Sequence, residues 1–485
     1  ATIQNVDTIL NDVATAGSID LGAGLNIGTA GVAVNAITGL ASGADTNEEG
    51  ATILVSGETA GDQAALINVA STAVMYVETV TADLNGTVDN VTLSATGIEE
   101  YTVGGAQPDA LADIQGAALD LTASAGGIGA AGAIEIESTS LTALATGNVD
   151  LNELTGDLNV ASVTGANVTL AAGGAIEEFG ADAFSDITGA TITLNSGRTA
   201  AAGVGAVATL ELDASTALNI DTNGDATVDV QDTAGDLPIG VINAGTGGTV
   251  TLDAEGDAIT DALAGETALD FNVIAQTLTM TADTNIGFGD DIDVSDVDAL
   301  DAQTAAGSID IDNTASAAVT ATLITGAAGT IDYDQTGGQQ LTVTDATVVD
   351  GNITISSTGV GSSILVTDIN GADDTVTLTT DGTITTNGAG DDDIVGGTLT
   401  IVRATDIGVD AGDDNAVDGT WLDTSVAVLN ILSSTNAWID ELVGGIEAAD
   451  VTATNDFGLD AIGQVTLTKV TATDVFIDTD ADIVD

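Results

Sequence analysis

Glycine residues recur nine positions apart in one part of this chain, at Gly147, Gly156, Gly165 and Gly174. They separate three similar segments, NVDLNELTG, DLNVASVTG and ANVTLAAGG, in which the apolar residues occupy nearly the same places. A short strand followed by a glycine corner, repeated at a fixed period, is what a coiled β-solenoid requires. The spacing therefore predicts a repeat array built from short strands.

Segments of the same kind extend over most of the 485 residues. Each alternates apolar residues with Thr, Asp or Asn, which is the pattern of a half-buried strand. Examples lie at 18–21, 51–57, 90–97, 133–138, 190–197, 248–256, 351–359 and 374–382. The block AAGSIDID at 305–312 also repeats TAGSIDL at 15–21. We expect an all-β chain whose coils each contain roughly 20 residues.

An antiparallel meander or tandem β-sandwich domains would also explain short, regularly spaced strands. Tight hairpins favour dipeptides such as Asn85-Gly86, and these are few in this sequence. Their scarcity favours the solenoid over the sandwich alternative.

Two segments have some helical character, and two positions suggest boundaries. Apolar residues at helical spacing make 108–121 the best helix candidate, and 441–450 is a second. Pro108 and Pro238 are the two prolines of the chain, and each is a candidate sub-array boundary. We therefore divide the sequence into regions 1–107, 108–237 and 238–485, which can all belong to one continuous solenoid.

Charge constrains the partners of this protein. The chain has 75 acidic residues against three basic ones, Arg198, Arg403 and Lys469, and its net charge is −72. Such a surface repels nucleic acid and attracts divalent cations. No run of 18 apolar residues is present, so we expect no insertion into a membrane.

The chemistry open to this chain is narrow because it contains neither His nor Cys. The usual general bases, nucleophile triads and zinc ligands are therefore absent. Paired carboxylates could still hydrolyse a glycosidic bond, but the aromatic platforms that polysaccharide-active clefts use are scarce. Trp421 and Trp438 are the two tryptophans, and their apolar neighbours favour core packing for both. We expect that this protein is not an enzyme.

Three segments, at 166–178, 248–261 and 374–386, share a Gly-bounded Val-Thr-Leu strand that leads through a small-residue turn into a second short strand. These segments resemble the repeats of filamentous-haemagglutinin-like giant bacterial surface proteins. The resemblance implies a right-handed parallel β-helix, export from the cell and a role in surface fibres or adhesion. This sequence is far more acidic than that resemblance suggests.

Two acidic segments resemble calcium loops, for which hard oxygen ligands are required. NGAGDDDIVGG at 387–397 resembles a single calcium-binding nonapeptide of the RTX type. DTNGDATVDVQD at 221–232 resembles the calcium loop of dockerins, although Ala226 replaces the glycine of its sharp turn. The candidate metal ligands that these resemblances imply are Asn387, Gly388, Gly390, Asp392, Asp221, Asn223, Asp225 and Asp232, with Ca²⁺ as the possible cofactor.

These observations favour one function and leave two others open. The favoured function is an extracellular structural subunit of a surface fibre, sheath or surface layer, secreted and stabilised by divalent cations. Its partners would be copies of itself, held end to end or by strand addition. An adhesin that binds surface glycans is the alternative, with 421–446 as its candidate ligand region, and a polysaccharide-active enzyme is the third.

Overall fold

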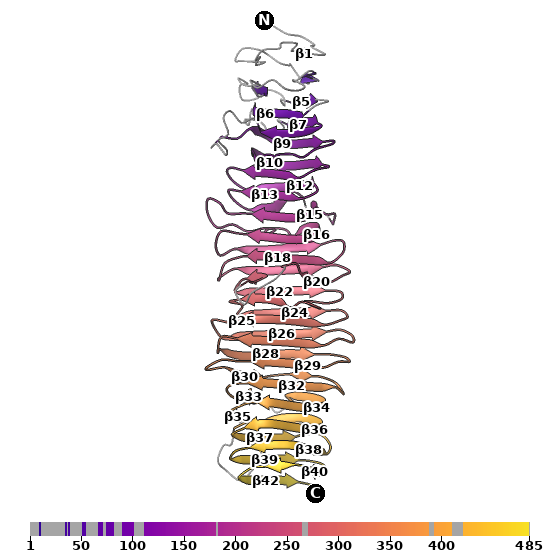
Figure 1. Ribbon diagram of the computed structural model, residues 1–485, viewed down its shortest axis with the longest axis vertical. Coiled ribbons are helices and arrows are strands. Elements are labelled where there is room, and N and C mark those ends of the chain that lie inside the picture. The colour runs from indigo at the N-terminus through magenta and orange to yellow at the C-terminus, as the bar shows by residue number, and fades with distance from the viewer. Residues whose placement is uncertain are drawn as a thin grey trace. The chain divides into compact units, whose positions relative to one another are not determined.

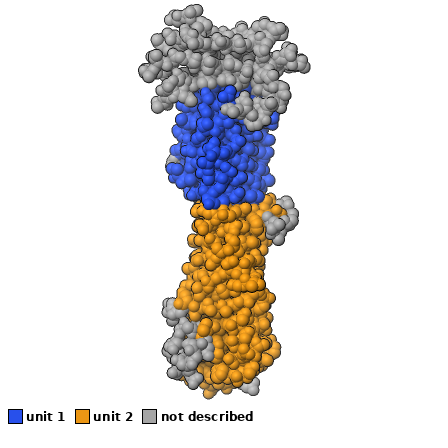
Figure 2. Space-filling view, turned by 90° about the vertical axis from the view of Figure 1, so that its left-hand side faces the viewer, with its two compact units in different colours: residues 1–245 blue, residues 246–485 orange. Residues whose placement is uncertain are grey.

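The computed structural model describes 90–100, 111–180, 183–263, 270–387, 392–409 and 421–484, together with the short strands β1 to β6 of the first 81 residues. The chain divides into two compact units, Ala1–Gly245 and Thr246–Asp485, which Figure 2 shows in different colours. The division lies near Pro238, whereas the three sequence regions stay predictions. The described residues are strands and their connections, with no helix among them.

The strands of unit 1 follow one another at short intervals. Their bounds are β1 Ile9–Leu10, β2 Val34–Asn35, β3 Ile37–Thr38, β4 Ala51–Leu54, β5 Leu66–Ala70, β6 Val74–Thr81, β7 Asn90–Ala95, β8 Gly97–Glu100, β9 Ile114–Ala123, β10 Ile134–Ala145, β11 Val149–Glu153, β12 Leu158–Thr164, β13 Val168–Ala172, β14 Ile176–Glu178, β15 Ile187–Asn195, β16 Leu210–Asp221, β17 Thr227–Asp232 and β18 Leu237–Asn243.

Unit 2 has the same organisation. Its strands are β19 Thr249–Ala254, β20 Ile259–Asp261, β21 Val273–Ile274, β22 Thr277–Ala282, β23 Ile292–Ser295, β24 Ala299–Thr304, β25 Ile309–Thr314, β26 Val319–Thr325, β27 Ile331–Thr336, β28 Gln340–Thr347, β29 Ile353–Ser357, β30 Ser363–Val366, β31 Ile369–Asn370, β32 Thr375–Thr380, β33 Ile384–Thr386, β34 Ile394–Arg403, β35 Asp406–Ile407, β36 Leu422–Ser434, β37 Asn436–Glu441, β38 Ile446–Ala453, β39 Asp456–Ala461, β40 Val465–Leu467, β41 Val470–Thr471, β42 Asp474–Thr479 and β43 Ile483–Val484.

Within each unit, strands pair in parallel with strands one coil further along, so that successive coils stack as rungs (Figure 1). Ile309, Ile331 and Ile353 occupy the same place in three successive rungs, and a rung in this part of unit 2 contains 22 residues. This parallel stacking confirms the predicted β-solenoid. It also shows that the alternative of tandem sandwiches is wrong for the described residues, because sandwiches are built from antiparallel sheets.

The nine-residue period reflects two strand-and-corner steps per coil. Val149 and Leu151 of β11 pair with Val168 and Leu170 of β13, so strands two periods apart are neighbours. The strand between them, β12, pairs in the same way with β14. The predicted coil of about 20 residues is close to the 19 to 23 residues that separate most paired positions.

Alternation along each strand places every second side chain inside the coil. Ile353 and Ile355 are fully buried, as are most of the inward Val, Leu and Ile side chains of both units. Full burial of one such side chain contributes about 1.5–3 kcal/mol to stability. A polar column also lies inside unit 2, where Asn313, Gln335, Ser357 and Thr380 stack in register and are at most 1% exposed.

Both helix predictions are wrong where the chain is described. Residues 114–121 belong to β9 and 446–450 to β38, while 108–110 lie outside the described residues. The apolar residues of β9 continue the interior columns of β7, with Leu119 opposite Val91 and Leu121 opposite Leu93. Tertiary pairing therefore decides the conformation of this short apolar stretch. Within the described residues, no helix has the length and apolar character needed to cross a bilayer.

One type of corner depends on glycine. Gly129 follows the buried Ile128, has a φ of +68°, and donates its N–H to the carbonyl of Ile98 at 2.8 Å. A Cβ on Gly129 would overlap the carbonyl oxygen of Asp150 in the next rung. The same Ile/Val-Gly corner recurs with positive φ at Gly205, Gly287 and Gly408.

Replacing this glycine is expected to destabilise unit 1. Gly129→Ala should lower the free energy of unfolding by about 2 kcal/mol, because an L-residue is strained at positive φ and the next rung must shift. Gly132→Ala is the control, since its Cβ would meet no atom closer than 3.7 Å. Thermal unfolding followed by circular dichroism gives the comparison, and equal melting temperatures for the two variants would contradict the role of the corner.

Candidate cation-binding sites

One recurring corner of the coil has additional residues between two successive strands, here called its loop, and an acidic residue or an asparagine directly precedes the second strand. Asp113, Asp186, Asn272 and Asp393 directly precede β9, β15, β21 and β34, and all four are buried. Each donates its backbone N–H to a carbonyl of the next rung, at 2.8–3.1 Å. These residues continue the hydrogen-bonded ladder where a loop would otherwise interrupt it.

The first of these corners contains three buried carboxyl groups. Glu100 precedes the loop, Asp113 follows it, and Glu135 lies in the next rung; their oxygens lie within 4.8 Å of one another. The backbone N–H of Glu135 donates to Asp113 Oδ2 at 3.1 Å. Burial, together with the neighbouring charges of Glu100 and Glu135, raises the pKa of Asp113 to about 8 despite that hydrogen bond, which lowers it. Such a cluster requires shared protons or a bound cation.

A second corner in unit 1 repeats the arrangement. Glu178, Asp186 and Glu211 are all buried, and their carboxyl oxygens again lie within 4.8 Å of one another. Asp186 donates its N–H to the carbonyl of Glu211 at 2.8 Å, as Asp113 does to Glu135. Because the two clusters share their positions in the coil, the same chemistry is open to both.

In unit 2, a neutral side chain stands at each equivalent corner. Asn272 replaces the Asp, and its Nδ2 donates to Asp261 Oδ1 at 2.5 Å while its Oδ1 accepts the N–H of Asp293 at 2.8 Å. At the next corner, Thr386 replaces the first acid and donates to Asp393 Oδ1 at 2.8 Å. These neutral donors provide the hydrogen bonds that a second carboxylate cannot.

A third carboxyl cluster lies on the surface of unit 2. Asp291, Asp293 and Asp312 are partly exposed and have oxygens within 4.8 Å of one another. Asp312 pairs in register with Asp334 of the following rung. Burial, followed by the charges of Asp291 and Asp334, raises the pKa of Asp312 to about 7. This cluster is open to solvent and could take up a cation without unfolding.

Beside it, Asp310 and Asp332 pair in a second column. Burial and the charge of Asp332 raise the pKa of Asp310 to about 6. Rungs lie about 4.8 Å apart, so the outer face carries neighbouring like charges.

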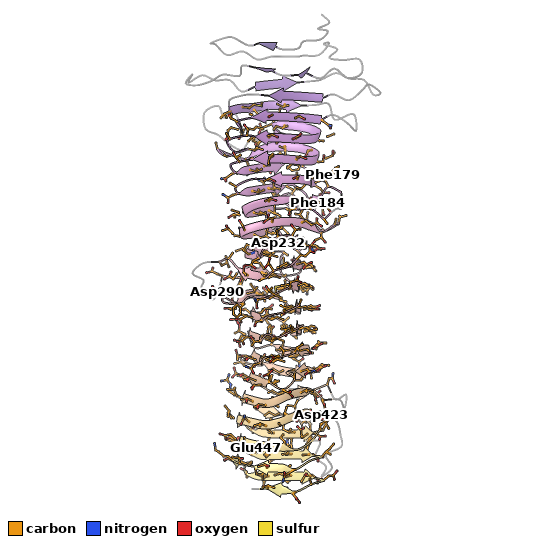
Figure 3. All side chains as sticks on the ribbon, turned by 90° about the vertical axis from the view of Figure 1, so that its right-hand side faces the viewer. Phe179, Phe184, Asp232, Asp290, Asp423 and Glu447 are labelled. Atoms are coloured by element: carbon orange, nitrogen blue, oxygen red, sulfur yellow. The ribbon has the colours of Figure 1, made fainter. Side chains whose placement is uncertain are left out.

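The dockerin-like segment is split between two places. Asp221 ends β16, and Asn223 has a φ of +53° in the turn that follows, where its N–H donates to Asp221 Oδ1 at 3.0 Å. Asp225 is exposed in the same turn. Asp232 lies at the far end of β17, where it is fully buried and accepts the N–H groups of Ala214 and Ala234 (Figure 3). The structure therefore does not bring Asp232 to the other three residues.

The RTX-like segment is described only in part. Gly388 and Gly390 lie outside the described residues. Asn387 is exposed, and its Nδ2 donates to Thr367 Oγ1 at 3.3 Å, while Asp392 is partly exposed. The buried acid of this loop is the next residue, Asp393, whose pKa burial raises to about 6. Calcium binding by either segment stays a prediction.

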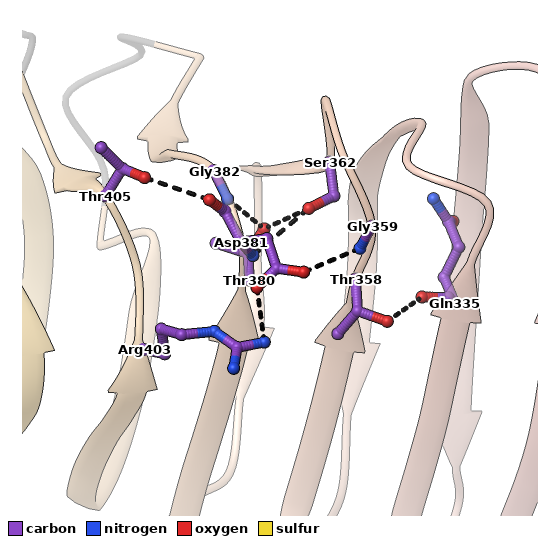
Figure 4. A network of polar contacts seen from close by, with 9 residues as sticks. All are labelled: Gln335, Thr358, Gly359, Ser362, Thr380, Asp381, Gly382, Arg403 and Thr405. Carbon is purple, nitrogen blue, oxygen red and sulfur yellow. Dashed lines mark hydrogen bonds and ion pairs between the residues drawn. The ribbon is translucent and has the colours of Figure 1, made fainter.

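The basic residues are engaged within the chain. Arg403 forms an ion pair with Asp381 at 2.6 Å, and Lys469 forms one with Asp450 at 2.7 Å. Asp381 also accepts the N–H of Gly359 at 2.9 Å (Figure 4). In unit 1, Arg198 donates to Asn152 Oδ1 at 2.5 Å.

The tryptophans occupy a place that sequence reasoning did not predict. The inward positions of β37 are taken by Ala437 and Ile439, both fully buried, so Trp438 lies on the outer face of the coil. It is nevertheless 9% exposed, because its ring contacts that of Trp421 with centroids 5.3 Å apart. Trp438 is therefore buried, as the core-packing prediction expects, but it packs against neighbouring rings on the outer face of the coil.

Comparisons with known proteins give no functional information, so a function has to be argued from the fold and the carboxyl clusters. No family model, no curated protein and no solved structure matches the chain.

Proposed function

We propose that this protein is a structural subunit of an extracellular assembly, such as a surface fibre, sheath or surface layer. The observation that carries the proposal is the uniformity of the described chain, in which both units consist of parallel rungs. Repetition of one rung gives a stiff scaffold in which each rung contacts its neighbours. The likeness of its segments to filamentous-haemagglutinin-like repeats supports a location on a cell surface.

Divalent cations are part of this proposal because of the in-register carboxylates. Two carboxylates about 4.8 Å apart in water repel each other by roughly 0.9 kcal/mol. The columns containing Asp310 and Asp312 repeat that repulsion from rung to rung. Calcium prefers several carboxylate oxygens, so cations between acidic faces would offset repulsion within one copy and between copies.

The rung formed by β42 and β43 offers a surface for a further rung. Val475 is 45% exposed and Ile483 is 52% exposed, whereas Phe457 and Val465, their partners one rung earlier, are fully buried. A strand added in the same register would cover both side chains and pair with the backbone edge. In the proposed assembly, a second copy supplies that strand.

Electron microscopy tests the assembly and its cation dependence together. At high protein concentration in millimolar calcium, we expect fibres or sheets, and excess chelator should disperse them because the acidic faces then repel. Monodisperse single particles in calcium would contradict the proposal.

A substitution in β42 tests the docking surface directly. Val475→Asp should raise the protein concentration needed for assembly by about tenfold, because it places a charge where an apolar contact is expected. Ile462→Asp is the control, since Ile462 is 58% exposed in the turn after β39 and does not face the interior. Identical assembly by the two variants would rule out docking through β42.

A further inference from the structure

Three aromatic rings gather on the outer face of unit 2, where β36, β37, β39 and β42 are neighbours. The ring centroids of Trp421 and Trp438 are 5.3 Å apart, and those of Trp438 and Phe476 are 5.9 Å apart. Trp438, Gly458 and Phe476 are in register on three successive rungs. A Cβ on Gly458 would overlap the ring of Trp438, so this glycine allows the rings of the two flanking rungs to meet. We call Trp421, Trp438 and Phe476 the aromatic stripe.

Acidic residues flank the aromatic stripe on both sides. Residues two apart on a strand share a face, so the residues on either side of the stripe form two columns, in which every member but Asn436 is an aspartate. One flank contains Asp406, Asn436, Asp456 and Asp474, and the other contains Asp423, Asp440, Asp460 and Asp478. We call these two columns the acidic rails; Asp423 is labelled in Figure 3.

The rail that contains Asp423, Asp440 and Asp460 is electrostatically strained. Burial, followed by the charges of Asp460 and Asp423, raises the pKa of Asp440 to about 6. Burial and then the charge of Asp478 raise the pKa of Asp460 as well. The ion pairs among the described residues, Arg403 with Asp381 and Lys469 with Asp450, do not include a rail carboxylate. A positive charge brought from outside would therefore relieve repulsion along this rail.

We propose that the aromatic stripe and its acidic rails bind a basic peptide segment of another protein. Ring faces attract ammonium and guanidinium groups through their quadrupole, and carboxylates on either side would accept hydrogen bonds from the same groups. Phe476 is 53% exposed and offers the ring surface for this contact. A second copy of this chain does not fit the surface, because it brings three basic residues against 75 acidic ones. This binding surface shares β42 with the proposed docking edge, but it uses the outward side chains Asp474, Phe476 and Asp478 rather than the inward Val475.

The two tryptophans of the protein both lie in the stripe, so their fluorescence reports on this surface. The probe is a ten-residue peptide of alternating arginine and serine, titrated into the full chain in the presence of chelator. We expect a saturable change in tryptophan emission with this peptide and none with its glutamine-serine counterpart. Unchanged emission at the highest concentration of the arginine peptide would overturn the proposal.

Variants separate local recognition from the general attraction of an acidic protein for cations. Phe476→Ala and the double variant Asp474→Asn with Asp478→Asn should each weaken binding by about five- to tenfold. The control, Asp310→Asn with Asp332→Asn, removes the same charge from a column elsewhere in unit 2 and should weaken binding less than about twofold. All these side chains are at least partly exposed, and circular dichroism checks that each variant folds.

Equal weakening by the rail and control variants would overturn the proposal, because binding would then follow net charge alone. An emission change with neutral oligosaccharides, but not with the arginine peptide, would overturn it in favour of a glycan surface.

Discussion

Lowering the pH from 8 to 5 is expected to raise the melting temperature of this protein, on the order of 10 °C, in the presence of chelator. The reason is a set of carboxyl groups whose pKa burial raises well above its ordinary value near 4. The pKa is about 8 for Asp113 and Glu153, about 7 for Asp232, Asp312 and Glu441, and about 6 for Asp310, Asp393 and Asp440.

The direction follows from proton binding. Between pH 4 and the folded-state pKa, the folded chain holds a proton on each of these groups and the unfolded chain does not. Their stabilising contribution is therefore fully present below about pH 4 and is lost as the pH rises through 6 to 8. One pKa unit corresponds to about 1.4 kcal/mol, so deeply buried groups such as Asp113 and Glu153 contribute a few kcal/mol each.

Thermal and denaturant unfolding at several pH values between 5 and 8 would measure this effect. Chelator is needed because a bound cation would stabilise the ionised form and mask the titration. A melting temperature that is constant or falls on acidification would show that the buried carboxyl groups are not protonated in the folded chain.

Exchanging the corner residues between the two units is expected to have opposite effects. At pH 8, Asn272→Asp should destabilise unit 2 by about 3–5 kcal/mol, because a fully buried carboxyl group would then face the carboxylate of Asp261. Asp113→Asn should stabilise unit 1 by a few kcal/mol at the same pH, since it removes one of three clustered carboxyl groups.

Asparagine is the appropriate replacement for Asp113 because its side-chain oxygen can still accept the backbone N–H of the next rung. Asn272 Oδ1 already accepts a backbone N–H of the next rung, as Asp113 Oδ2 does. At pH 5 both changes in the free energy of unfolding should become smaller, because the Asp side chains are then largely protonated. If Asp113→Asn destabilises unit 1 at pH 8 in chelator, the argument from buried protons is contradicted. If it destabilises unit 1 only when calcium is present, the cluster binds a cation.

Much of the solenoid could be predicted from the sequence because its information is local. The segments at 190–197 and 374–382 alternate strictly; the first covers the second half of β15 and the second contains β32. Their inward residues, such as Ile192 and Val376, are fully buried as the alternation predicts. Glycine spacing also gave nearly the right coil length, since corners depend on short-range backbone geometry.

The helix predictions failed because a short apolar stretch has no decisive period. In β9, the buried positions Ile114, Ala117, Leu119 and Leu121 break strict alternation, and Gly116 lies at the irregularity. What fixes the strand is its parallel pairing with β7 and β10, a contact between distant parts of the sequence that a local pattern does not contain.

The buried carboxyl clusters were missed for the same reason. Glu100 and Glu135 are far apart in sequence, and stacking of rungs brings them together. A usable signal was present, since Ile-Glu-Glu at 98–100 and at 176–178 is followed after the loop by Asp-Ile at 113–114 and at 186–187. The search for contiguous calcium loops selected 221–232 instead, where Asp232 is separated from the other candidates by a whole strand.

The loops at the recurring corner have a consequence for how such a gene can change. Successive paired residues are 22 apart where no loop intervenes and 30 apart between β34 and β36, yet the ladder remains parallel on both sides. Codons gained or lost at these corners therefore change the length of one connection and leave the strand register of all the remaining rungs unchanged. Lineages carrying this fold can differ in length at those places while the strands keep their pairing partners.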